Sequence, residues 1–204
     1  MLDGLARRII DPSLNAAGRA LASAGVTANG VTWGAFACGM AAAAAIALGA
    51  LWLGLALLLL GRIGDGLDGS VARASGTGAT DFGGFLDISL DFAFYGAIPL
   101  AFAVLDPEAN AIAACTLVLT FYVNGGTVLA FAVMAEKRAA KGEAVSRGDK
   151  SLLFTTGLAE GTETIGVFVL MCLFPSAFAV IAYLFAAVCA VTAGARIALA
   201  ARVF

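Results

Sequence analysis

The chain of 204 residues contains no histidine. A Ser-His-Asp triad and an HExxH metal site both need that side chain, so neither can be built here. Cysteine is scarce as well: no two cysteines form a CxxC pair, and the four lie at positions 38, 115, 172 and 189. Because all four fall in apolar stretches, we expect buried small residues and not metal ligands or disulfide partners.

Charge is the second deficit. Charged residues make up 13% of the chain, against about 25% in an average soluble domain, and the mean hydropathy is +0.97. A membrane-spanning helix needs about 20 mostly apolar residues. Six stretches qualify and use nearly the whole chain: 29–50, 51–73, 83–105, 110–135, 151–174 and 176–201. The expected fold class is therefore an all-α integral membrane protein with six transmembrane helices.

The N-terminal 24 residues have a different pattern. Leu5 and Ile9 can face lipid while Arg7 and Arg8 face headgroups, which is typical of an amphipathic segment lying on a membrane. Pro12 is expected to break this segment once. We therefore expect two parts, a juxtamembrane helix over residues 1–24 that serves as an anchor and a membrane domain over residues 25–204.

Basic residues are distributed on one side of the predicted spans. The 12 lysines and arginines lie at positions 7, 8, 19, 62, 73, 137, 138, 141, 147, 150, 196 and 202. With a cytoplasmic N-terminus and six spans, each lies in or toward the cytoplasm, and the three opposite loops carry none. This positive-inside bias places both termini and the Gly61–Asp91 stretch at the cytoplasmic face of the membrane. With a net charge of −2, no nucleic-acid partner is expected.

Gly61–Asp91 holds five aspartates within an otherwise apolar chain. A charge facing lipid costs about 2.5–3.5 kcal/mol, so something must compensate these acids. Asp65 and Asp68 are three residues apart, Asp87 and Asp91 are four apart, and each pair shares a helix face. We expect two antiparallel neighbouring helices whose four carboxylates converge. Such hard oxygen ligands suit Mg²⁺ or Mn²⁺, and two metals about 4 Å apart commonly serve displacement at phosphorus.

Small and basic residues accompany the aspartates. Gly69 and Ala72 leave no bulk beside Asp68, so a ligand could approach the backbone there, and Arg73 offers a fixed fork for phosphate oxygens. The glycines fit close helix packing equally well. Arg62 lies one turn before Asp65 and is expected to neutralise that face.

Two consecutive patterns, Asp65-x-x-Asp68-Gly69-x-x-Ala72-Arg73 and Gly83-x-x-x-Asp87-x-x-x-Asp91, resemble the signature of the CDP-alcohol phosphotransferase (CDP-alcohol phosphatidyltransferase) family. Members of that family make phospholipid headgroups. One feature departs from the family: nine residues, 74–82, separate the two patterns where eight are usual. The wider chain resembles an uncharacterised bacterial inner-membrane subgroup.

The resemblance implies a reaction and roles for each matched position. Phosphatidyl groups would pass from CDP-diacylglycerol to an alcohol, with release of CMP. The four aspartates would hold two Mg²⁺ or Mn²⁺ ions, and Asp91 would also act as general base. The resemblance further implies a homodimer and CDP-binding roles for Gly69, Ala72, Arg73, Thr80 and, with Ala28 replacing the family's proline, Asn29.

The sequence leaves the acceptor open among glycerol phosphate, inositol phosphate, serine and another lipid. Arg147, Lys150 and Arg196 would form a basic pocket for a phosphorylated acceptor, although positive-inside anchoring explains them too. Glu160 and Glu163 either join helices by hydrogen bonds or bind the acceptor headgroup.

Two other functions also use clustered acids in a membrane protein. A small multi-span cation transporter would place its acids near the membrane centre and show internal repeats, whereas these aspartates gather at one end of their helices. An intramembrane prenyltransferase also uses aspartate-rich Mg²⁺–pyrophosphate sites, but the DGxxAR element at 68–73 does not belong to that class.

Overall fold

The structure is a computed structural model that describes residues 3–76, 78, 80–142 and 161–204, with the backbone alone for residues 3–12. These residues are helical apart from short turns, and no strand occurs among them. The helices, with a 3₁₀ turn at Pro175–Ala177, are α1 (Asp3–Ser23), α2 (Ala28–Ala47), α3 (Leu51–Ala74), α4 (Asp81–Leu105), α5 (Pro107–Ala139), α7 (Gly161–Leu173) and α8 (Phe178–Val203).

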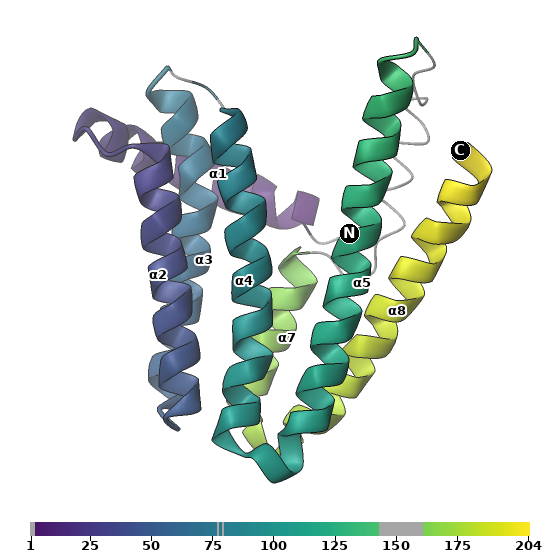
Figure 1. Cartoon of the computed structure of the whole chain (residues 1–204). Helices are drawn as coiled ribbons and strands as arrows, with labels where there is room; N and C mark the ends of the chain where they lie inside the picture. Colours follow the sequence, from purple (N-terminus) through teal and green to yellow (C-terminus); the bar gives the residue numbers. More distant parts are fainter. Residues whose placement is uncertain (1–2, 77, 79, 143–160) are drawn as a thin grey trace.

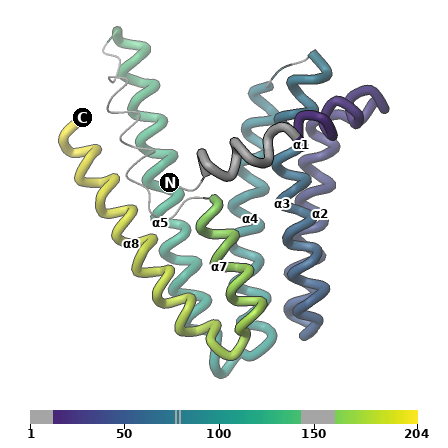
Figure 2. Tube along the Cα trace, turned by 180° about the vertical axis from the view of Figure 1, so that it is seen from behind, coloured from purple at the N-terminus to yellow at the C-terminus, as the bar shows by residue number. Residues whose placement is uncertain are grey.

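The long helices form two groups that diverge toward one end (Figure 1). Helix α2 packs against both α3 and α4, while α5 packs along α8. Helix α7 lies between the two groups, as the view from behind shows (Figure 2). Helix α1 crosses the bundle at a steep angle and packs on α3. Helices α1 and α2 therefore support α3 and α4, the two helices that carry the acidic stretch.

Capping side chains fix where three of the helices begin. Thr27, Thr80 and Asp106 each accept a hydrogen bond from the backbone N–H three residues on, at 3.1, 3.0 and 3.1 Å, at the starts of α2, α4 and α5. Between α3 and α4, Gly76 and Gly78 adopt φ angles of +74° and +67°. Glycine adopts such angles without strain, so these two glycines allow the chain to turn between the two helices.

Small residues bring α2 and α3 close together. A Cβ placed on Gly61 would lie 3.0 Å from the carbonyl oxygen of Ala35, and one on Gly64 would lie 3.1 Å from Ala35 Cβ. Small residues at such crossings are the usual means of packing membrane helices. By contrast, α3 and α4 make only marginal backbone contact. These two helices are therefore linked through α2, which packs on both, and through the side chains that meet between them, as between Arg62 and Asp91.

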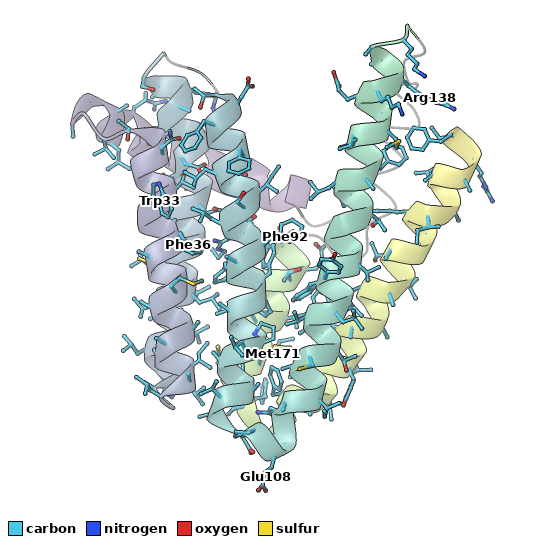
Figure 3. The ribbon with its side chains drawn as sticks, viewed as in Figure 1. Trp33, Phe36, Phe92, Glu108, Arg138 and Met171 are labelled. Atoms are coloured by element: carbon cyan, nitrogen blue, oxygen red, sulfur yellow. The ribbon has the colours of Figure 1, made fainter. Side chains whose placement is uncertain are left out.

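The core lies where the groups converge. Phe94 on α4 meets Phe168 on α7 edge to face at 5.9 Å between ring centres, and Phe102 stacks on Phe178 of α8 at 4.6 Å. All four rings are fully buried, as is Met171 of α7, which Figure 3 shows within the bundle. Aromatic pairs of this kind add about 0.5–1.5 kcal/mol beyond area burial, so they hold α7 and α8 to α4.

Four helical segments are long and apolar enough to cross a membrane: α2, α4, α5 and Pro175–Val203, which contains α8. The all-helical integral membrane fold is thus confirmed. Helix α3 carries Arg62, Asp65, Asp68 and Arg73, and the described part of the fifth predicted span is a shorter apolar helix, α7. The count of six spans stays a prediction, as does the division at residue 24.

Two local expectations were wrong. Helix α1, of 21 residues, continues through Pro12 without a break, because a proline inside a helix can kink it without ending it. Of the cysteines, Cys172 and Cys189 are buried as expected, whereas Cys38 is half-buried and Cys115 is exposed on α5. An exposed apolar side chain on a membrane helix can face lipid. An apolar stretch therefore does not show by itself whether a cysteine is buried, because that depends on which face of the helix carries it.

Candidate functional site

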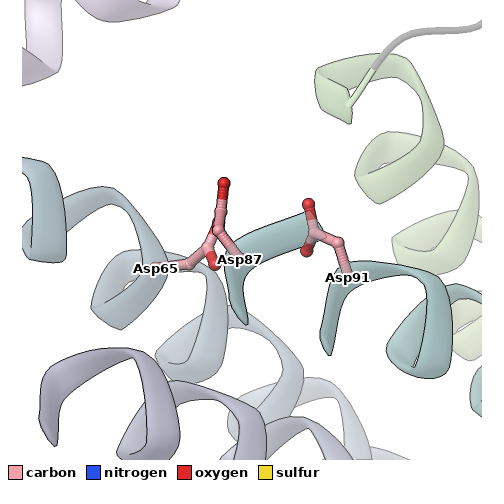
Figure 4. Close-up of side chains that lie close together, drawn as sticks. All are labelled: Asp65, Asp87 and Asp91. Carbon is pink, nitrogen blue, oxygen red and sulfur yellow. The ribbon is translucent and has the colours of Figure 1, made fainter. Parts of the chain in front are cut away.

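Three aspartates from two helices converge in the space between α3 and α4. One carboxylate oxygen from each of Asp65, Asp87 and Asp91 lies within 4.8 Å of the others, as Figure 4 shows. The four-residue spacing of Asp87 and Asp91 puts both on one face of α4, while α3 supplies Asp65 from the other side. Three hard oxygen donors at this separation fit a divalent cation such as Mg²⁺ or Mn²⁺.

Asp68, the fourth predicted ligand, lies outside that trio of oxygens. Its Oδ2 accepts a 2.8 Å hydrogen bond from the Thr32 hydroxyl of α2, and its Oδ1 accepts one from the backbone N–H of Gly69. Asp68 also lines a pocket beside the cluster. Its role as a metal ligand stays a prediction, and Thr32 is a site residue that sequence reasoning missed.

A pocket of about 460 Å³ opens beside the acidic cluster. That volume is in the range of a small-molecule site. Its wall comes from the α1–α2 turn, the start of α2, the end of α3, the α3–α4 connection and the start of α4. Four residues predicted to bind the CDP moiety lie on it together with two of the aspartates: Asn29, Gly69, Ala72, Thr80, Asp68 and Asp87.

Helix starts shape one wall of the pocket. Thr80 serves as N-cap of α4 through Gly83, and a Cβ on Gly83 would lie 3.4 Å from Asn29 Oδ1. Thr27 and Gly25 line the same wall, and Gly25 has a φ of +80°. A capping threonine shortly after a turn glycine is a local signal for Thr27 and Gly25, but nothing in the sequence indicates that they face a ligand pocket.

Arg73 is held by the N-terminal helix. Its Nη2 donates to Asn15 Oδ1 at 3.2 Å and to Ser70 Oγ at 3.0 Å, and Ser70 donates to the same Asn15 oxygen at 3.1 Å. Helix α1 can approach α3 this closely because residue 18 is a glycine: a Cβ there would lie 2.6 Å from Ser70 Cβ. Helix α1 thus contacts a residue that is predicted to bind the CDP moiety, and the sequence alone did not indicate this contact.

Arg62 lies between the two acidic helices. Its Nη1 donates to Asp91 Oδ1 at 2.9 Å and to Asp65 Oδ2 at 3.4 Å. The expected neutralisation of Asp65 is confirmed. The shorter contact with Asp91 was not foreseen, because the two residues are 29 positions apart.

The predicted acceptor residues are only partly described. Arg196 of α8 is buried and donates to Asn124 Oδ1 of α5 at 2.5 Å, and half-buried Glu163 lies in the first turn of α7. Arg147, Lys150 and Glu160 lie outside the described residues. The structure thus brings one predicted basic residue to the α5–α8 interface and leaves the basic pocket itself a prediction.

Comparison with known proteins identifies the family. The sequence profile described as CDP-alcohol phosphatidyltransferase matches residues 25–195. This chain belongs to that family. It is also 43% identical over 197 residues to the inner membrane protein YnjF of Escherichia coli (strain K12), covering 97% of this chain and 94% of that one.

Solved structures share the fold. Phosphatidylinositol phosphate synthase (PgsA1) of Mycobacterium tuberculosis with CDP-DAG bound gives a TM-score of 0.68 at 23% identity, over 90% of this chain and 91% of that one. The same enzyme with manganese and citrate gives 0.68 at 24%, over 91% and 88%. At such identity the likeness establishes the architecture alone.

Family membership assigns CDP-alcohol phosphotransferase chemistry to this integral membrane protein. It leaves the cation-transporter and prenyltransferase alternatives without support. The acidic cluster and the adjoining pocket are the places where divalent-metal-dependent chemistry of this kind would be carried out.

Proposed function

We propose that this protein transfers the phosphatidyl group of CDP-diacylglycerol to an alcohol and releases CMP. The observation that carries the proposal is the continuity of the two parts of the site. Asp87 belongs both to the acidic cluster and to the wall of the 460 Å³ pocket, and Asp68 lies on that wall as well. A nucleotide in the pocket would therefore present its pyrophosphate to the carboxylates.

The pocket side of the site suits the cytidine end of the donor. Gly69 adds no side chain to the wall, and Arg73 Nη1 would lie 3.4 Å from a Cβ built there. Ala72, Asn29 and Thr80 complete the surface predicted to contact the nucleotide. Arg73, whose Nη2 donates to Asn15, is proposed to bind phosphate oxygens from its position beside Gly69.

The acidic side would hold the metals. We assign two Mg²⁺ or Mn²⁺ ions to Asp65, Asp68, Asp87 and Asp91; when bound they would neutralise pyrophosphate charge. Asp91 is the proposed general base, and it receives the proton of the acceptor hydroxyl. The acceptor oxygen forms a bond to the lipid-side phosphorus, the bond from that phosphorus to the CMP oxygen breaks, and CMP departs with the electron pair.

The acceptor is proposed to approach from the side of α7. The Asp91 carboxylate points toward Asp87 and Asp65 (Figure 4). Tyr95, one turn after Asp91 on α4, brings its hydroxyl 3.6 Å from a Cβ built on Gly161 at the start of α7. Arg196 on α8 and Glu163 in the first turn of α7 are proposed to contact the acceptor. Together with Arg147 and Lys150 they are the candidates for headgroup recognition, and a phosphorylated alcohol is the class a buried arginine fits best.

The proposed orientation puts both termini and the site at the cytoplasmic face. Arg138 and Glu108 mark opposite ends of α5 (Figure 3), and the turns at the Glu108 end, residues 48–50, 106 and 174, carry no lysine or arginine. This asymmetry supports the positive-inside assignment. A homodimer remains part of the proposal.

The deciding experiment measures CMP release from CDP-diacylglycerol by purified protein with Mn²⁺ or Mg²⁺ and a panel of alcohols. The panel contains glycerol phosphate, inositol phosphate and serine, with Asp91→Asn as the inactive variant. Asp106→Asn is the matched control, because asparagine caps a helix as well as aspartate and Asp106 begins α5 at the far end. Metal-dependent release with one acceptor supports the proposal. If no acceptor releases CMP and CDP-diacylglycerol does not bind, the proposal is wrong.

A further inference from the structure

Arg62 is a positive charge built into the acidic cluster. Its side chain is 14% exposed, and its Nη1 contacts carboxylate oxygens on both helices that supply the cluster. Those two residues, Asp65 and Asp91, are two of the three whose oxygens lie within 4.8 Å of one another. The guanidinium therefore contacts the same groups that would hold a divalent cation.

An aromatic ring also holds Arg62 in position. Its Cζ lies 4.3 Å from the centre of the Phe94 ring, which is fully buried. A guanidinium over an aromatic face is attracted by the negative charge density of the ring. Among the described residues, Nε is buried without a hydrogen-bond partner, so the two carboxylates and the ring are the contacts that hold this charge in place.

A fixed charge here has two physical consequences. It repels a divalent cation that shares the same carboxylates, because like charges a few ångströms apart cost free energy even at the effective dielectric of a protein. It also restricts Asp91, since a charged hydrogen bond at 2.9 Å limits the rotamers that this carboxylate can adopt.

We propose that Arg62 is a positioning residue that tunes this site: it orients Asp91 and weakens divalent-metal binding, so that the ions bind well only when the donor pyrophosphate adds its own negative charge. The inference rests on the proposed function, because it assumes metal binding at the aspartates. It concerns metal affinity, however, and can fail while CMP release is intact.

The direction in which the Mn²⁺ affinity changes distinguishes this role from a structural one. A variant that merely disorders the site binds Mn²⁺ more weakly, whereas removal of a repelling charge makes binding tighter. Arg62→Gln should therefore lower the Kd for Mn²⁺ about tenfold without donor, measured by electron paramagnetic resonance of free Mn²⁺. The donor-induced gain in Mn²⁺ affinity should shrink in the same variant. Turnover at saturating Mn²⁺ should fall about tenfold because Asp91 loses its partner.

Arg62→Lys provides a second test. Its single, shorter ammonium cannot span both carboxylates, so we expect Mn²⁺ binding about threefold tighter than in the wild type. Arg202→Gln, at an exposed arginine in the last turn of α8, is the matched control and should leave the Kd unchanged. Unchanged or weaker Mn²⁺ binding in Arg62→Gln overturns the proposal. If Arg62→Gln is not monodisperse, the same result in Arg62→Lys overturns it.

Discussion

The hydroxyl of Thr32 on α2 donates a 2.8 Å hydrogen bond to Asp68 Oδ2 on α3. Thr32 is 5% exposed, and its hydroxyl also lies 3.1 Å from the carbonyl oxygen of Ala28 in its own helix. Both Thr32 and Asp68 line the proposed nucleotide pocket. The contact therefore holds Asp68, an acidic residue of the pocket wall, to α2, a helix that bears none of the proposed metal ligands.

Thr32→Val should leave the helix packing intact and release Asp68. Valine matches threonine in shape, and hydrogen bonds to charged groups contribute about 1.5–3 kcal/mol, so CMP release should fall roughly tenfold. Thr116→Val is the matched control, because that hydroxyl donates to Ile112 of its own helix, α5. Equal activity of the two variants would show that Asp68 does not depend on Thr32.

Two glycines of α3 allow pocket shape and helix packing to be tested separately. Gly69→Ala adds a Cβ to the pocket wall, where Arg73 Nη1 at 3.4 Å is the nearest atom. We expect normal folding and a KM for CDP-diacylglycerol raised about tenfold. Gly64→Ala places its Cβ 3.1 Å from Ala35 Cβ and should instead lower the melting temperature, because overpacking costs about 1–3 kcal/mol. A Gly69→Ala variant with unchanged donor KM would contradict the pocket assignment.

Asn15 should affect the reaction from outside the membrane domain. Asn15→Leu removes the acceptor shared by Ser70 and Arg73, so Arg73 loses its fixed orientation. The expected result is a donor KM raised about fivefold with little change in Mn²⁺ affinity, by analogy with the loss of one charged hydrogen bond. Ser13→Ala, at an exposed position on the same helix, is the control. The assay is CMP release at varied CDP-diacylglycerol.

Arg196 should influence the acceptor and not the donor. Arg196→Gln removes the buried charge that donates to Asn124. With a phosphorylated acceptor we expect its KM to rise about 10- to 100-fold, the effect of losing a charge-assisted contact, while the KM for CDP-diacylglycerol stays the same. Arg202→Gln serves again as the control. A rise in both KM values would indicate structural damage, and thermal melting would then be measured.

Metal removal gives the last prediction. Treatment with EDTA should abolish CMP release, and Mn²⁺ or Mg²⁺ should restore it, because the carboxylate oxygens of Asp65, Asp87 and Asp91 favour these hard cations. Zn²⁺ should restore less, since it prefers nitrogen and sulfur ligands in tetrahedral sites. Full activity after exhaustive chelation would contradict a metal role for the cluster.

Much of the fold followed from local patterns. Helix starts at Thr27, Thr80 and Asp106 depend on a side chain and the backbone three residues on, and apolar runs determine most helices between them. The predicted span 110–135 proved too short at both ends, since α5 runs Pro107–Ala139. Polar residues in its last turns extend a helix beyond its apolar part, so hydropathy alone underestimates its length.

The sequence by itself determined which aspartates share a helix face, because spacings of three and four residues place side chains on one face whatever surrounds them. The tertiary structure decided that Asp65 meets Asp87 and Asp91 while Asp68 lies apart from them. Only the tertiary structure decided how those residues are partnered. Small residues such as Gly61 let α2 approach α3 and bring Thr32 to Asp68, while the space between α3 and α4 lets Arg62 reach Asp91. The reason is physical: helix periodicity acts over a few residues, whereas these contacts depend on how helices far apart in the chain pack together.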